Sequence, residues 1–184
     1  MKLNKHIKAF SVPLDYGYRF IHNNIRARDL TVHYAPVYAA AGNDFATAGN
    51  LTFFGAPANL NRPYSGHIAY IEANYGANGW AGAAIGYNVL EQPCADITTG
   101  TLTGNCTMTQ GADFAVVLFN SFYNPNPSNA VMAHLLRHET SHVLGLGHEV
   151  CTPSTSVMSP NRFCTPMHTT LQPDDVNLIN AWYP

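Results

Sequence analysis

The stretch from His138 to His148 constrains this chain more than any other part of its sequence. It reads His-Glu-Thr-Ser-His-Val-Leu-Gly-Leu-Gly-His, so that His138 and His142 are four residues apart. On an α-helix this spacing places two side chains on one face, with their Cβ atoms about 5–6 Å apart. Gly145 stands where a helix-ending glycine belongs, and it lets the chain turn so that His148 can return. The spacing therefore predicts a helix and a sharp turn that bring three imidazoles to one point.

Three imidazoles at one point are a ligand set that suits zinc, with Zn–N distances of about 2.0–2.1 Å. Three protein ligands leave one position open for water, as in catalytic rather than structural zinc sites. Glu139 projects beside the ligand face, where it can accept a proton from zinc-activated water and deliver it to a leaving amine. The sequence thus predicts one zinc ion bound by His138, His142 and His148, with Glu139 as general base. The alternative is a helix that carries three surface histidines.

These residues resemble the signature of the metzincin metalloproteases, His-Glu-x-x-His-x-x-Gly-x-x-His. Members of that family also have a tight turn with a methionine beneath the metal, and Ser156-Val157-Met158-Ser159-Pro160 is similar to it. The resemblance implies that Met158 forms an apolar floor under the histidines and is not a ligand. Taken alone, a methionine in a loop is more often simple packing.

Within the metzincins the chain is most similar to the matrixins, over most of its length. The resemblance implies an α+β fold, with a twisted mixed sheet, an active-site helix and a C-terminal helix. It also implies that a peptide substrate binds along an edge strand containing Gly82, Ala83 and Ala84. The segments that carry the likeness are Tyr18–Phe20, Val37–Phe54, Gly79–Ala84 and Leu171–Tyr183.

Several residues depart from the matrixin pattern. Glu149 follows the third histidine, where matrixins usually have serine. Only His67 is available in the region that would hold a second, structural zinc ion, so that site is not predicted. The resemblance also implies calcium, but no calcium motif can be traced, and Asp96 and Asp113 are weak candidates.

Local patterns predict five strands and three helices. The strands are expected at Tyr16–His22, Leu51–Phe54, His67–Tyr75, Trp80–Tyr87 and Phe114–Phe119. One helix is expected between Asp29 and Thr47, with a start that Pro36 can shift to its own position. A second runs from an N-cap at Ser128 to Leu144, and a third begins at Pro173.

The length of 184 residues fits one domain. We expect an upper lobe over about 11–147, a lower lobe over about 148–184, and a basic tail over 1–10. Only 11% of the residues are charged and the net charge is −2, which argues against a nucleic-acid partner. No apolar run approaches the roughly 18–20 residues of a membrane span.

The four cysteines indicate an oxidising, secreted setting. They allow three pairings, and proximity in sequence favours two local bridges that each close a loop of about 13 residues. The alternative is four reduced, buried cysteines. The favoured pairs are Cys94–Cys106 and Cys151–Cys164.

Six other positions carry expectations. Pro160 and Phe163 are expected to line an apolar pocket for the residue after the scissile bond. His134, one turn before His138, is interpreted as a core residue rather than a spare ligand. For Arg137, a solvated side chain is favoured over a pair with Glu149. By resemblance, one of the two aspartates at positions 174 and 175 anchors the methionine turn from below.

Together these features predict a secreted, monomeric zinc endopeptidase that hydrolyses peptide bonds of extracellular proteins. One competing hypothesis is a zinc-holding binding module that grips another protein without catalysis. Another is an enzyme restricted to its own propeptide or to one partner. The intact Glu139 disfavours the first of these and leaves the second open.

Overall fold

A computed structural model describes residues 19–29, 35–55, 65–96, 101–107, 109–148, 156–159 and 166–184. This part of the chain forms five strands and three helices. They are β1 (Asn24–Asp29), α2 (Ala35–Ala48), β2 (Thr52–Gly55), β3 (His67–Ala73), β4 (Gly82–Tyr87), β5 (Phe114–Asn120), α3 (Asn129–Val143) and α4 (Pro173–Trp182).

The strands form one sheet in the order β2-β1-β3-β5-β4. The first three neighbouring pairs are parallel, and β4 runs antiparallel to β5 at the edge. Parallel neighbours need a crossover connection, and α2 supplies it between β1 and β2. The chain therefore has a mixed α/β fold whose sheet ends in one antiparallel strand.

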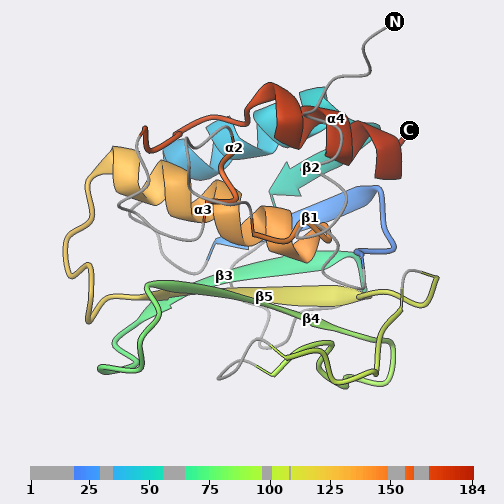
Figure 1. Ribbon diagram of the computed structural model, residues 1–184, viewed down its shortest axis with the longest axis horizontal. Helices are drawn as coiled ribbons and strands as arrows, with labels where there is room; N and C mark the ends of the chain where they lie inside the picture. Colours follow the sequence, from blue (N-terminus) through green and yellow to red (C-terminus); the bar gives the residue numbers. More distant parts are fainter. Residues whose placement is uncertain are drawn as a thin grey trace, which may run out of the picture.

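The three helices lie together on one side of the sheet (Figure 1). Helix α3 packs against β4 and β5, while α2 contacts α3, α4 and β2. The core between these layers is apolar, and its largest fully buried side chains include Phe20, Phe45, Tyr70, Met132 and Leu136. Helix α3 is thus held between the sheet and α2. This packing fixes the position of the side chains that α3 directs toward β4.

Most of the predicted elements are confirmed within a few residues, but the described part of the predicted first strand, residues 19–22, does not form a strand. Of the expected Tyr16–His22 strand, residues 16–18 lie outside the described part, and Phe20 makes only an isolated bridge with Ala112. The strand that joins the sheet in this part of the chain is β1. Both of its partners, β2 and β3, are distant from it in sequence. Phe20 is 1% exposed and belongs to the hydrophobic core.

The segment that follows β4 folds back on it. The Cys94 N–H donates to the Gly86 carbonyl oxygen at 2.8 Å, and Cys94 forms a disulfide with Cys106 across a Cα–Cα distance of 5.1 Å. This confirms one predicted bridge; Cys151 and Cys164 lie outside the described residues.

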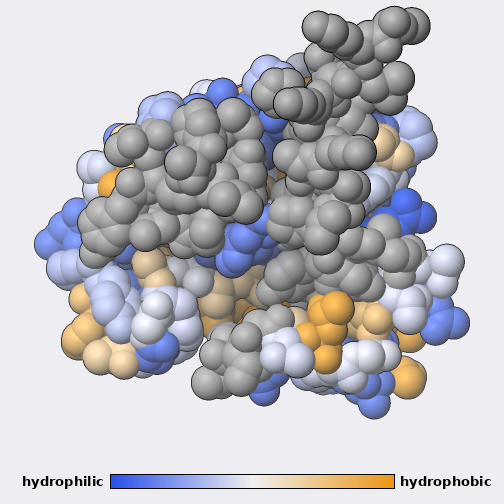
Figure 2. Space-filling view, in the orientation of Figure 1, coloured by the Kyte–Doolittle hydropathy of each residue, from blue (hydrophilic) through white to orange (hydrophobic). Residues whose placement is uncertain are grey.

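The surface near the sheet has an apolar part. Figure 2 shows apolar atoms in the lower half of the face drawn, at the level of the sheet in Figure 1. Three of the large hydrophobic side chains that are exposed, Val89, Leu90 and Leu102, belong to the segment after β4. Among the described helices, none has both the length and the apolar character that a membrane crossing needs.

Candidate metal centre

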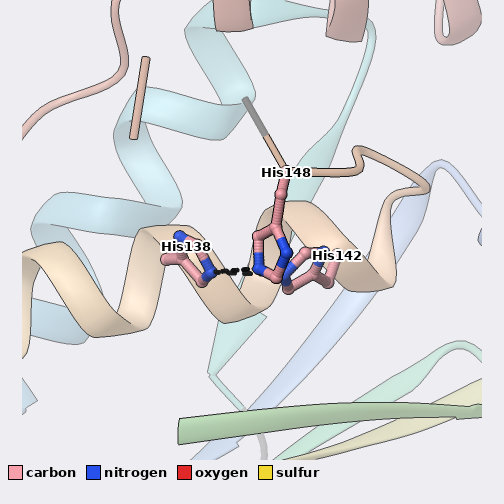
Figure 3. Close-up of side chains that lie close together, drawn as sticks. All are labelled: His138, His142 and His148. Carbon is pink, nitrogen blue, oxygen red and sulfur yellow. Dashed lines mark hydrogen bonds between the residues drawn. The ribbon is translucent and has the colours of Figure 1, made fainter. Parts of the chain in front are cut away.

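Helix α3 positions the first two histidines of the site. Its N-cap is Ser128, whose side chain accepts from the Val131 N–H, and the helix runs to Val143. Gly145 then adopts a φ of 104°, in the left-handed region that favours glycine, and its N–H donates to the His142 carbonyl oxygen. The chain turns back there, and His148 points toward the two helical histidines (Figure 3).

The three rings meet through their Nε2 atoms. These lie 3.2 Å apart for His138 and His142, 3.2 Å for His138 and His148, and 3.1 Å for His142 and His148. Two ligand atoms of a tetrahedral ion with bonds of 2.0–2.1 Å are about 3.3 Å apart. The predicted convergence is present, and the three histidines could hold a metal ion.

The other ring nitrogens explain why these Nε2 atoms suit a cation. His138 Nδ1 lies 2.8 Å from the Val157 carbonyl oxygen, and His142 Nδ1 lies 2.7 Å from the Leu146 carbonyl oxygen. A carbonyl oxygen can only accept, so each Nδ1 carries the proton and each Nε2 presents a lone pair. Lone pairs directed at one another are unfavourable without a cation between them, and this donor set therefore fits a metal.

Burial keeps the helical histidines in the form that binds metal. It lowers the pKa of His138 to about 3, with a further contribution from a charge on His148. It also lowers the pKa of His142 well below the ordinary value. Both imidazoles are consequently neutral near pH 7, which is the protonation state of a histidine ligand.

A turn formed by residues 156–159 supports His138 from behind. The carbonyl of Val157 accepts from His138, and the Val157 N–H donates to Asp175 Oδ2 at 3.1 Å. Asp175 Oδ1 accepts from the Ser156 hydroxyl, and Met158 is fully buried in the same turn. Asp175 is 1% exposed and thus anchors this turn, as the resemblance implied for one of the two aspartates.

Glu139, the predicted general base, lies on α3 beside the first ligand. Its side chain is buried, and burial raises its pKa to about 8. A cation bound by the neighbouring histidines would favour the carboxylate form. The side chain also lies against Gly82, at the start of β4.

The predicted substrate-binding residues divide between the described and undescribed parts of the chain. Gly82, Ala83 and Ala84 form the first half of β4, at the edge of the sheet, and are half-buried. Pro160 and Phe163 lie outside the described residues.

His134 has the core position that we expected for it. It is 5% exposed, and its Nδ1 lies 2.9 Å from the His168 carbonyl oxygen. It therefore packs one turn before the ligands without belonging to the group of three nitrogens.

The expectation for Arg137 is wrong. Its side chain is buried, and its Nε and Nη2 donate to Asp44 Oδ2 at 2.8 and 2.6 Å. The reason is that α2 packs across α3, which brings together residues 93 positions apart. This ion pair fixes α3 next to the first ligand.

Sequence reasoning missed Asn120, which organises the bend before β4. Its side chain is 1% exposed, accepts from two backbone N–H groups and donates to three oxygens. The only signal in the sequence is a polar residue that ends the apolar run of β5. The bonded groups are the N–H of Tyr75 and Phe122, the carbonyls of Gly76 and Trp80, and the Asn78 side chain.

Comparison with known proteins adds no family to this geometry. No protein-family model matches the chain, and no curated protein matches it. The function must therefore be argued from the site.

Proposed function

We propose that this protein is a secreted zinc endopeptidase of the metzincin type that hydrolyses peptide bonds of extracellular proteins. The observation that carries the proposal is the convergence of three Nε2 atoms within 3.1–3.2 Å, with Glu139 next to the first ligand. Zinc is the metal that three neutral imidazoles suit best when one position stays open.

The proposed chemistry divides between the metal and Glu139. His138, His142 and His148 would hold a zinc ion, which would supply activation of a water molecule and polarisation of a carbonyl group. The Glu139 carboxylate accepts a proton from the attacking water and delivers it to the leaving amine. Its buried position excludes bulk water from that proton transfer.

Strand β4 stands at the end of the sheet that the described residues form, and its outer side suits an extended peptide. The Gly86 carbonyl faces away from β5, because it accepts from Cys94. Backbone groups alternate along a strand, so the N–H and C=O of Gly82 and Ala84 face the same way. A peptide strand can pair with these groups, and the side chains at both positions are small enough to permit close approach.

The Cys94–Cys106 disulfide supports the secreted location, because such bonds persist in oxidising compartments. The same bridge braces the segment that covers the far end of β4. A bound peptide would thus pair with the first half of the strand, next to Glu139.

The change Glu139→Gln tests this proposal. We expect the variant to bind about one zinc per chain, as the wild type does, because the three histidines are untouched. Hydrolysis should fall by about 10²–10⁴-fold, which is the usual contribution of a general acid–base residue. Metal analysis combined with cleavage of a broad peptide library measures both effects.

Glu91→Gln is the matched control, because it makes the same chemical change at an exposed residue in the turn after Tyr87, at the end of β4 opposite Gly82. It should leave cleavage unchanged. A zinc-loaded wild type that cleaves no peptide in the library would contradict the proposal and favour the binding module. Equal cleavage by Glu139→Gln and wild type would contradict the role of Glu139.

A further inference from the structure

Gly82 and Glu139 are in unusually close contact. A Cβ atom added at Gly82 would lie 2.5 Å from Glu139 Oε1 and 3.0 Å from its Cγ and Cδ. Non-bonded carbon atoms pack at about 3.5–4.0 Å, so a side chain at position 82 would force the Glu139 carboxyl to move. The present position of the Glu139 carboxyl against β4 therefore depends on the missing side chain.

The conformation of Gly82 does not itself require glycine. Positive φ angles occur at Gly66, Gly76, Gly79, Gly104 and Gly145 among the described residues, and not at Gly82. A glycine within a strand weakens it, through lost backbone entropy and lost packing. The absence of a side chain at position 82 instead leaves space for Glu139, whose carboxyl lies where a Cβ atom would be.

Ala84 shows that the strand otherwise accepts a methyl group on this face. It lies two residues further along β4, so its side chain points to the same side of the sheet as a side chain at position 82 would. It packs against the hydrophobic core. The restriction to glycine is therefore local to the contact with Glu139.

We propose that Gly82 is a positioning residue for Glu139, an inference that rests on the proposed function. The missing side chain lets the Glu139 carboxyl lie against the strand. The backbone of the same residue faces outward, toward the place of a bound peptide. Gly82 thus sets the distance between the general base and the peptide that pairs with β4.

A stability cycle tests the contact without any measurement of activity. The four proteins are wild type, Gly82→Ala, Glu139→Ala and the double variant. We expect Gly82→Ala to lower the Tm of the wild type by about 5 °C, because the added methyl displaces Glu139. In the Glu139→Ala background the same change should leave Tm unchanged or raise it, because alanine suits a strand better than glycine. Equal losses in both backgrounds would overturn the proposal.

Kinetics then separate positioning from substrate binding. We expect Gly82→Ala to keep its zinc and to lose about 10²-fold in kcat, the effect of roughly 1 Å of misplacement, with KM changed by less than about threefold. Gly42→Ala is the control, because its added methyl meets the Phe53 Cβ at 3.3 Å, away from the site, and it should keep the wild-type kcat.

The outcomes distinguish this inference from the proposed function. A rise in KM with an unchanged kcat would show that Gly82 serves only to bind peptide, and would overturn the positioning role. A wild type without hydrolysis would contradict the proposed function, and the stability cycle would still decide whether Gly82 holds Glu139 in place.

Discussion

Among the described residues, two clusters of polar side chains that contain histidine are built differently. In one, the Nε2 atoms of His138, His142 and His148 face one another within 3.1–3.2 Å. In the other, His22 Nε2 lies 2.8 Å from Asp113 Oδ1 and 3.2 Å from the Ser65 hydroxyl. Both clusters have ring nitrogens at hydrogen-bond distance from polar atoms, so distance alone does not separate them.

The difference lies in where the protons are. The Asp113 carboxylate accepts from His22 and, at 2.8 Å, from Ser65, so the donors of this cluster have an acceptor. In the group of three histidines, the backbone carbonyls of Val157 and Leu146 accept from the Nδ1 atoms of His138 and His142, so the Nε2 lone pairs of these two rings face the centre. Proximity of histidines is therefore not enough to indicate a metal site. The stronger indication is that ring nitrogens which carry no proton point toward the same place.

The largest effect is expected from His142→Ala. One of three ligands is lost, so bound zinc should fall from about one per chain to a small fraction of that, and hydrolysis with it. His22→Ala should keep about one zinc per chain, because His22 already has its partner in Asp113. Metal analysis after dialysis against equimolar zinc measures both variants. Loss of zinc from His22→Ala would show that the cluster of His22, Asp113 and Ser65 also contributes to metal binding.

The sequence predicted the metal group because its parts are local. The ligands lie within eleven residues, and helix geometry with one glycine is enough to bring them together. The cap at Ser128 and the start of α4 at Pro173 follow from equally local chemistry. Such features need no knowledge of how distant segments pack.

The features that were missed depend on packing between distant segments. Arg137 was expected in solvent because its partner Asp44 lies on another helix, 93 residues away. Strand β1 was missed because its pairing with two distant strands, and not its own sequence, decides its position. The contact between Gly82 and Glu139 likewise arises only when β4 packs against α3.

A smaller effect is expected from Asp175→Asn, which weakens the support behind a ligand. Asp175 holds Val157 through its N–H, and Val157 holds the His138 ring through its carbonyl. An amide accepts less strongly than a carboxylate and cannot accept at both of its ends, so the turn should loosen. We expect zinc affinity to fall by about 10–100-fold, measured by competition with a chelating dye.

Asp174→Asn is the matched control for that change. Asp174 is the neighbouring residue in the first turn of α4, whereas the Ser156 hydroxyl and the Val157 N–H both donate to Asp175. Its substitution should leave zinc affinity within about twofold of the wild type. Equal losses in the two variants would show that the charge of the helix start, and not the support of Val157, controls the affinity.

The smallest effect is expected from His22→Ala on stability. The variant removes a partly buried hydrogen bond while Asp113 keeps Ser65 as a donor, so the cost should be about 1 kcal/mol, or about 2–4 °C in Tm. That loss should be the same with and without a chelator, because the cluster does not depend on metal.

Chelation alone should lower the Tm of the wild type by more, since a ligand at about 1,000 times its Kd stabilises a protein by about 4 kcal/mol. Thermal unfolding of both proteins under both conditions measures the four values. A loss from His22→Ala that vanishes on chelation would show that the two clusters are coupled, and that the hydrogen-bonded one contributes to holding the metal.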